Sequence, residues 1–206
     1  MPAGRATATS NRSRDDDARA TRERLVAVAL ELFSERGYAD VGTEEIVQRA
    51  EVTRGALYHH FADKRDLFRA VHERVEEDMV GRIAAEMGGV TDPWDVLTTG
   101  TRAFLAACRD PAVKQIALTD APAVLGWTEW REIDERYGLG LMKSALGAAM
   151  DQGVLRRAPL DTLSHLMLGA LSEAAFVVTN ASDPSAARDE AEEALLELLG
   201  GLRVQR

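Results

Sequence analysis

The chain has 206 residues, a formal net charge of -9 and an apolar content of 46%, so a sizeable core is possible in a small domain plus a larger one. Its single cysteine, Cys108, excludes an internal disulfide, and its apolar surroundings predict a buried thiol. The first residues lack the apolar core of a signal peptide, and no stretch looks long and charge-free enough to span a bilayer. We therefore expect a soluble, cytoplasmic protein without a membrane partner.

The negative charge is unevenly distributed along the chain. Residues 1–65 contain equal numbers of basic and acidic side chains, so the whole excess of negative charge lies in residues 66–206. Local charge rather than net charge determines attraction to a polyanion. The N-terminal part is therefore compatible with nucleic-acid binding, and the acidic C-terminal part should be held away from it.

Residues 1–17 are rich in Ala, Thr, Ser and Arg and show no periodicity, which predicts a disordered arm. Three basic residues, Arg5, Arg12 and Arg14, could reach a DNA minor groove, as N-terminal arms sometimes do. The run Asp15–Asp17 instead favours a solvated tail. From Ala18 to Arg36, apolar side chains recur at helical spacing and predict an amphipathic helix that ends at Gly37.

Residues 43–64 contain two short helical patterns on either side of a three-residue turn. Thr53 has the position and the side chain of an N-cap for the second helix. The inward-facing positions of the pair are Ile46, Val47, Ala50, Ala56, Leu57 and Phe61. This pattern predicts a helix-turn-helix, the unit that places its second helix in the DNA major groove.

The same segment resembles the DNA-binding signature of TetR-type bacterial transcriptional regulators, I-x-x-A-x-V-[ST]-x-G-x-L-Y-x-H-F-x-x-K-x-x-L. The matching positions are Ile46, Ala50, Val52, Thr53, Gly55, Leu57, Tyr58, His60, Phe61, Lys64 and Leu67. Residues 25–38 are similar to the first helix of that family. Two positions depart from its pattern. Glu51 replaces a turn glycine, which implies a positive φ at a cost of about 1 kcal/mol, and Gly42 replaces a hydroxyl cap that Thr43 could supply instead.

Polar side chains that the core does not need are the expected DNA contacts. The resemblance implies phosphate contacts from Thr43, Tyr58, His60 and Lys64, and Lys64 also lies near a helix N-terminus. Arg54 can pair with guanine in bidentate fashion. Packing is the alternative for Tyr58, and a plain surface position is the alternative for His60. The complete predicted surface is Thr43, Glu44, Thr53, Arg54, Gly55, Ala56, Tyr58, His59, His60 and Lys64.

The rest of the chain also reads as helical. A helix capped by Asp63 runs towards Met87 and joins the two parts covalently. The further predicted helices are Pro93–Arg109, Pro111–Thr119, Thr128–Gln152, Asp161–Asn180 and Pro184–Arg203. We therefore predict an all-α fold with a helix-turn-helix DNA-binding domain over residues 18–65. A larger helical effector-binding and dimerisation domain is expected over residues 66–206.

The last two predicted helices are amphipathic, and each could cover the other within one chain. The resemblance implies instead that they meet a second copy in a four-helix dimer interface. The predicted interface residues are Leu163, Met167, Leu171, Ala191, Leu195, Leu198 and Leu202.

Large rings and methionines gather outside the DNA-binding part, where the resemblance implies an enclosed small apolar or aromatic effector. The predicted pocket residues are Trp94, Phe104, Trp127, Trp130, Tyr137 and Met142, although core packing is an open alternative for each. An inward-pointing acid among Asp120, Glu129, Asp134 and Glu173 could select a cation. The segment 120–127 could form a gate.

No cluster of residues has the spacing of a metal site, a phosphate-binding loop or a catalytic triad, so we expect neither a cofactor nor catalysis. The sequence thus predicts a homodimeric repressor that binds a palindromic operator in double-stranded DNA and that a small effector releases. A constitutive DNA-binding protein without an effector is the alternative. An enzyme that has borrowed the fold is a more distant one.

Overall fold

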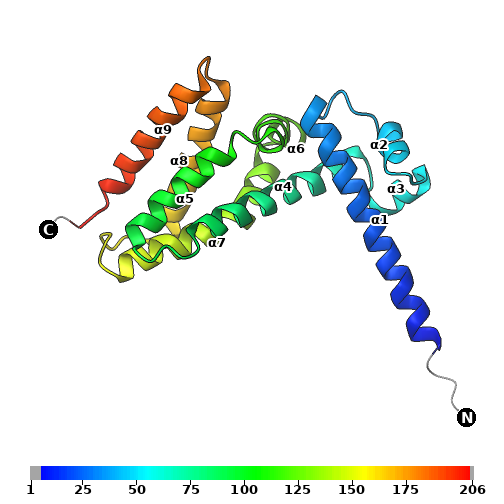
Figure 1. Cartoon of the computed structure of the whole chain (residues 1–206), viewed down its shortest axis with the longest axis horizontal. Helices are drawn as coiled ribbons and strands as arrows, with labels where there is room; N and C mark the ends of the chain where they lie inside the picture. The colour runs from blue at the N-terminus through cyan, green and yellow to red at the C-terminus, as the bar shows by residue number, and fades with distance from the viewer. Residues whose placement is uncertain (1–5, 205–206) are drawn as a thin grey trace, which may run out of the picture. The chain divides into compact units, whose positions relative to one another are not determined.

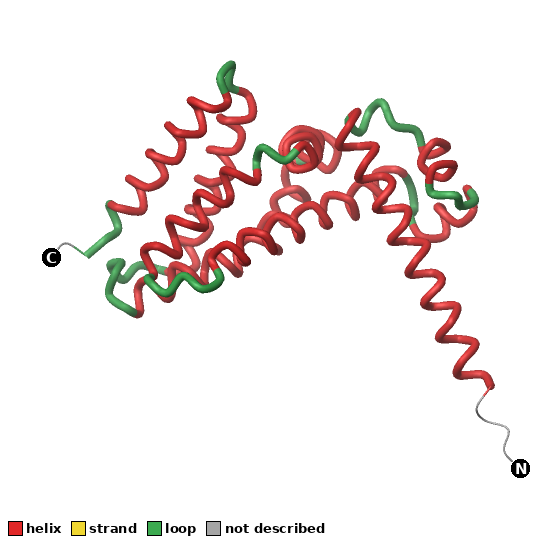
Figure 2. The backbone as a smooth tube through the Cα atoms, viewed as in Figure 1, coloured by secondary structure: helices red, strands yellow, loops and turns green. Residues whose placement is uncertain are grey.

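The computed structural model describes residues 6–204, and the chain divides into two compact units, Met1–Val71 and His72–Arg206. Within the described residues the regular elements are helices, and extended pairing is limited to one isolated bridge between Leu155 and Arg203 (Figures 1 and 2). The predicted all-α class is confirmed. The division lies six residues beyond the expected one, inside a continuous helix.

The first unit contains α1 (Ala6–Arg36), α2 (Thr43–Arg49), α3 (Arg54–His60) and the beginning of α4 (Lys64–Met87). Helix α1 begins at Ala6 rather than at Ala18, so residues 6–17 of the expected disordered arm are helical. Residues 1–5, including Arg5, lie outside the described residues. No Gly or Pro interrupts residues 6–36, and extending a helix that has already formed adds one hydrogen bond per residue.

The core of the first unit consists of the predicted apolar stripes. Leu25, Leu32 and Phe33 of α1 are at most 1% exposed. The rings of Phe33 and Phe68 meet edge to face, with 5.4 Å between their centroids, and Tyr38 contacts both rings. This cluster packs α1 against the start of α4.

The second unit contains the rest of α4 and six further helical elements. These are α5 (Pro93–Ala107), the π-helix η1 (Val113–Asp120), α6 (Ala121–Leu125), α7 (Trp127–Asp151), α8 (Leu160–Asn180) and α9 (Pro184–Gly200). Asp92 and Asp183 cap α5 and α9, and a proline follows each cap. The expected gate segment is largely helical, because α6 fills it before Gly126 breaks the chain at φ 80°.

Helices α5, α7, α8 and α9 pack against one another around the core of this unit, and α8 and α9 form a terminal hairpin (Figure 1). By length and composition alone α8 is apolar enough to cross a bilayer, contrary to our reading of the sequence. Its buried residues, among them Met167, Leu168 and Leu171, pack within the second unit. A core helix of a folded domain passes the same test of length and composition.

Candidate DNA interface and internal cavity

The turn between α2 and α3 has the geometry that its residues predict. Glu51 adopts φ 54°, the positive value expected where a glycine is missing. The hydroxyl of Thr53 accepts a hydrogen bond from the Ala56 amide over 3.1 Å and so caps α3. Gly42 caps α2 without a side-chain hydrogen bond, and Thr43 is the first residue of that helix. A local hydrogen bond thus stabilises the start of α3, directly after the turn that joins it to α2.

The predicted DNA-contact residues lie mainly on the solvent-exposed side of this unit. Thr53, Arg54, Gly55, His59 and Glu44 are exposed, and the side chain of Tyr58 is 43% exposed. Half-buried positions complete the predicted set, namely Thr43, Ala56, His60 and Lys64. By contrast, Leu57 of the same helix is fully buried. Helix α3 is therefore held by one apolar face and presents the other to solvent.

Two of the cations on this surface have partners within the chain. Arg54 donates from Nη1 to Oε1 of Glu44 over 2.6 Å, and its guanidinium lies 5.6 Å from the ring centroid of Tyr58. The Lys64 ammonium donates to the backbone carbonyl oxygen of Tyr38 and lies 4.0 Å from the centroid of the Tyr38 ring. Lys64 therefore anchors the start of α4 as well as being a predicted phosphate contact.

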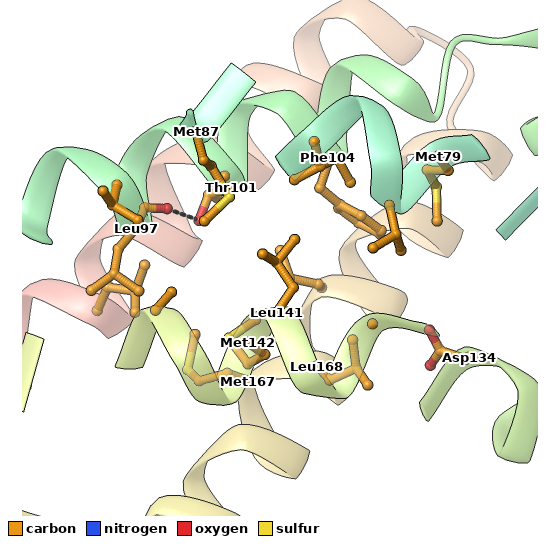
Figure 3. A pocket seen from close by; sticks show the side chains of 18 of the residues that line it. Met79, Met87, Leu97, Thr101, Phe104, Asp134, Leu141, Met142, Met167 and Leu168 are labelled. Atoms are coloured by element: carbon orange, nitrogen blue, oxygen red, sulfur yellow. Dashed lines mark hydrogen bonds between the residues drawn. The ribbon is translucent and has the colours of Figure 1, made fainter. Parts of the chain in front are cut away.

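The second unit contains a cavity of about 70 Å³, which is more than one water molecule needs. Figure 3 shows Met79, Phe104, Met142 and Leu168 around it. Its wall consists of Glu76, Met79, Val80, Ile83, Met87, Val96, Leu97, Gly100, Thr101, Phe104, Asp134, Gly138, Leu141, Met142, Ala145, Met167, Leu168, Leu171 and Leu199. The wall is thus almost wholly apolar, with two carboxyl groups.

Only Phe104 and Met142 of the six predicted pocket residues line this cavity. Of the other four, Trp130 lines a smaller pocket that shares Glu76, Phe104 and Asp134 with this cavity. Trp127 is 64% exposed, and Trp130 is buried, with its indole donating to the Ala117 carbonyl oxygen over 3.1 Å. Trp94 packs against the core beneath Arg203, whose guanidinium lies 4.4 Å from its ring centroid, and Tyr137 does not line the cavity wall. The cavity is thus lined mainly by methionine and leucine, and effector binding by the six predicted residues stays a prediction.

The two carboxyl groups in the cavity wall have altered acidity. Glu76 on α4 is 4% exposed, and burial, followed by the charge of Asp134, raises its pKa to about 8. Burial raises the pKa of Asp134 on α7 to about 6, against the opposing effect of Arg131. Burial also lowers the pKa of the neighbouring His72 to about 4. Near neutral pH, Glu76 and His72 are therefore mostly uncharged, whereas Asp134 is mostly ionised.

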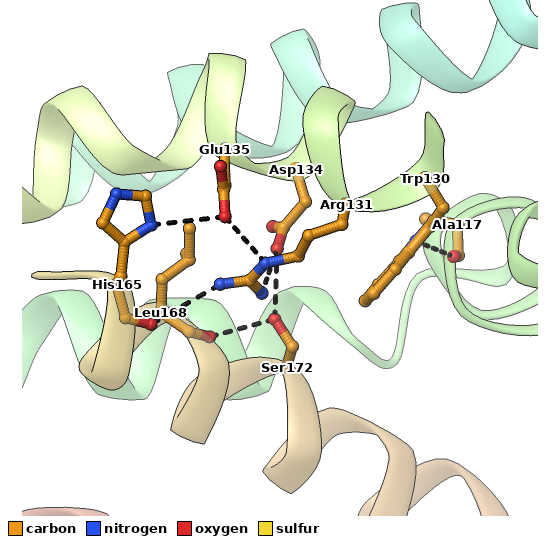
Figure 4. A network of polar contacts seen from close by, with 8 residues as sticks. All are labelled: Ala117, Trp130, Arg131, Asp134, Glu135, His165, Leu168 and Ser172. Carbon is orange, nitrogen blue, oxygen red and sulfur yellow. Dashed lines mark hydrogen bonds and ion pairs between the residues drawn. The ribbon is translucent and has the colours of Figure 1, made fainter. Parts of the chain in front are cut away.

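Asp134 belongs to a polar network between α7 and α8 (Figure 4). Arg131 donates to Asp134 and Glu135, each over 3.0 Å, and the Ser172 hydroxyl lies 3.3 Å from the same oxygen of Asp134. His165 contacts Glu135 over 3.2 Å. Asp134 thus accepts hydrogen bonds from Arg131 and Ser172, whereas Oε2 of Glu76 has no hydrogen-bond partner within residues 6–204.

The chain matches two family models over most of its length. Residues 25–71 match the model for bacterial regulatory proteins of the tetR family, and residues 94–202 match that for the C-terminal domain of tetracyclin repressor-like proteins. The chain belongs to the TetR family of transcriptional regulators. It is a DNA-binding regulator with a helix-turn-helix, as its sequence motif predicted.

Known members of the TetR family resemble this chain in sequence or fold over most of its length. A TetR-family regulator from Pectobacterium atrosepticum has 36% identity and a TM-score of 0.84, covering 92% of this chain and 97% of its own. The Tn10 TetC protein of Escherichia coli is 28% identical over 73% of this chain and 76% of its own. RolR in complex with resorcinol shares the fold, with 22% identity, a TM-score of 0.72 and coverage of 89% of each chain.

In this TetR-family chain the predicted dimer residues divide into two groups. Met167, Leu171 and Leu195 are at most 7% exposed, because they fill the core of their own unit rather than an open face. Leu163, Ala191 and Leu202 are half-buried, and Leu198 is 57% exposed. Helix α8 also exposes Leu166 and Val177, which are not among the predicted interface residues. One apolar stripe alone does not distinguish the inner face of a hairpin from its outer face.

Sequence reasoning included Asp134 among four acids of which one could point inward, but it missed Glu76. Of the other acids considered with Asp134, Glu173 is exposed, and neither Asp120 nor Glu129 lines the cavity. A usable signal was present, because Glu76 lies on the inward stripe of α4, one turn before Met79. A charged residue on an otherwise apolar stripe indicates a buried functional group. Within the described residues, no group of three or more metal-ligating side chains lies together.

Proposed function

We propose that this regulator is a cytoplasmic, homodimeric repressor that a small effector releases from a palindromic operator. The observation that carries the proposal is the composition of α4. This helix begins at Lys64, beside the helix-turn-helix, and its later residues Glu76, Met79, Ile83 and Met87 line the internal cavity. One continuous helix therefore contains residues of both the DNA-binding unit and the proposed effector site.

DNA recognition is assigned to the exposed side of α3. Arg54 contacts a base edge, while Thr43, Tyr58 and Lys64 contact phosphates. Gly55 leaves room for close approach, because a Cβ added there would meet no atom nearer than 3.8 Å. A protein dimer places two such helices on a two-fold symmetric site, which explains the palindrome.

Dimerisation is assigned to the outer face of the α8–α9 hairpin. Leu166, Val177 and Leu198 are each more than half exposed, and all three belong to these two helices. Exposed apolar side chains that cluster on one surface indicate an interface. A second copy of the hairpin, related by a two-fold axis, would cover this face and complete a four-helix contact.

The effector is assigned to the cavity beside α4. An effector can change DNA affinity only through different affinities for the two arrangements of the dimer, a coupling of typically about 1–3 kcal/mol. RolR, a neighbour in fold, has been solved in complex with resorcinol, which supports the proposal of a small effector here. A constitutive DNA-binding protein without an effector is less well supported, because the second unit contains a cavity with an almost wholly apolar wall.

Two measurements test these assignments. Binding-site selection with the full-length protein should recover a palindrome, and an asymmetric or random set of sequences would contradict the repressor proposal. A selected palindrome then allows screening for compounds that release it. Gly138→Leu should block release without loss of DNA binding, since a Cβ at Gly138 already meets Leu168 Cδ1 at 3.1 Å in the cavity wall.

Gly140→Leu is the matched control for the cavity variant. It lies on the same helix, and a Cβ added there meets nothing within 4 Å. Both variants carry the same change in helix propensity. A difference in their release by the effector therefore results from filling the cavity. If both respond to the effector as the native protein does, the effector binds elsewhere.

A further inference from the structure

One carboxyl group in the cavity wall has no partner that explains its burial. Glu76 is 4% exposed, and its Oε2 makes no hydrogen bond to the part of the chain that the structure describes. Its Oε1 lies 3.9 Å from Nδ1 of His72, too far for a hydrogen bond, and neither ring nitrogen of His72 has a hydrogen-bond partner among the described residues. Buried polar groups are usually hydrogen-bonded, so an orphaned carboxyl in a cavity requires an explanation.

The groups around Glu76 provide no compensating cation. His72 lies on its own helix, Asp134 and Tyr137 interact with it from α7, and the Cys108 thiol does so from the end of α5. Arg131 of α7 is occupied by Asp134 and Glu135. The surroundings of Glu76 are therefore acidic or neutral, and a positive charge is the missing element.

We propose that the cavity binds a small organic monoamine, whose ammonium group pairs with Glu76 and whose apolar body contacts the methionines of the wall. This proposal rests on the effector site proposed above and specifies its ligand class. Met79, Met87 and Met142 line the cavity, and their flexible side chains can adapt to a ligand that is larger than the empty space.

A cation fits better than a neutral alcohol for an electrostatic reason. Burial disfavours the carboxylate form of Glu76 in the empty protein, as its raised pKa of about 8 indicates. A bound ammonium group supplies the opposite charge and a donor, which lowers that pKa again. The Glu76 carboxylic acid then transfers its proton to solvent, leaving a carboxylate paired with the ammonium. Near neutral pH, binding of a monoamine should therefore release about one proton.

Calorimetry on the full-length protein with butylamine and 1-butanol tests this class, since the two probes share one alkyl chain. At about pH 7, butylamine should bind at least tenfold more tightly than 1-butanol and release about one proton, measured from the dependence of the heat on buffer ionisation. Its affinity should rise up to about tenfold per pH unit towards pH 8. Glu76→Gln should abolish the preference for the amine and the proton release.

Glu77→Gln, the same change on the exposed neighbouring residue of α4, should leave amine binding unchanged. Circular dichroism would establish that both variants fold, and proton release by the native protein tests the proposal independently of either variant. Butylamine that binds no more tightly than 1-butanol, or binds Glu76→Gln equally well, overturns the proposal. No DNA is present in this experiment, so that result would leave the repressor function standing and reassign only the ligand class.

Discussion

Arg54 at the start of α3 donates a hydrogen bond from Nη1 to Oε1 of Glu44 on α2 over 2.6 Å, which joins the two helices of the DNA-binding motif. Both side chains are about two-thirds exposed, at 65% and 69%. Such pairs contribute about 0–1 kcal/mol to stability. We infer that the pair acts mainly on DNA recognition, because Glu44 competes with DNA for the guanidinium.

Glu44→Ala is therefore expected to strengthen binding to all DNA sequences, since it removes a negative charge and releases the Arg54 guanidinium. Arg54→Ala is expected to relax the preference at one base pair of each half-site, by about 1–3 kcal/mol. Binding-site selection with each variant measures both effects. An unchanged operator for Arg54→Ala would show that Arg54 does not read a base.

Glu51 offers a test of backbone strain in the turn. Its φ of 54° is costly for any residue with a Cβ, and its side chain is exposed. Glu51→Gly should be more stable than Glu51→Ala by about 1 kcal/mol, although glycine also loses more entropy on folding. Urea unfolding of the two variants provides the comparison. Equal stabilities would mean that the turn relaxes when the side chain is shortened.

The dimer proposal is tested by two leucines of α9 that lie three residues apart and differ in burial. Leu198 is 57% exposed and Leu195 is 3% exposed. Leu198→Glu should yield folded monomers with weakened operator binding, whereas Leu195→Glu should destabilise the protomer itself by several kcal/mol, because it buries an unpaired charge. Sedimentation and circular dichroism separate these outcomes. A Leu198→Glu protein that remains dimeric would place the interface elsewhere.

The pH dependence of stability should reveal Glu76. A raised pKa means that the proton is held more tightly in the folded state, so the stability from Glu76 is present below its ordinary pKa of 4.5 and is lost as the pH rises through about 8. His72 has the opposite effect, because its pKa is lowered in the folded state. The stability that it contributes rises with pH and no longer changes above its ordinary pKa of 6.5. Asp134 has lost its contribution by about pH 6. Between about pH 6.5 and 8, therefore, Glu76 dominates.

In that window the free energy of unfolding should fall by up to about 1 kcal/mol per pH unit. Glu76→Gln should flatten the curve, because its amide does not titrate. Urea unfolding at a fixed protein concentration measures both slopes, since the stability of a dimer also depends on concentration. A native protein whose stability does not change across this window would show that Glu76 remains charged when buried.

Local sequence signals were sufficient for the DNA-binding unit. The Thr53 cap, the positive φ of Glu51 and the buried Leu57 each follow from side-chain chemistry within a few residues of the position concerned. The helical extension to Ala6 was missed, because composition alone does not show where helix propagation stops.

In the second unit, the amino-acid sequence determined that the chain would form helices with apolar stripes, and the tertiary structure decided what each stripe faces. Leu195 and Leu198 are equally apolar and three residues apart, yet one is buried in the protomer and the other is exposed. The tryptophans likewise suggested a pocket, whereas the wall of the cavity beside α4 consists mainly of methionines and leucines and contains Glu76. The spacing of residues along one helix specifies a direction around its axis, but burial depends on which distant helix packs on that side.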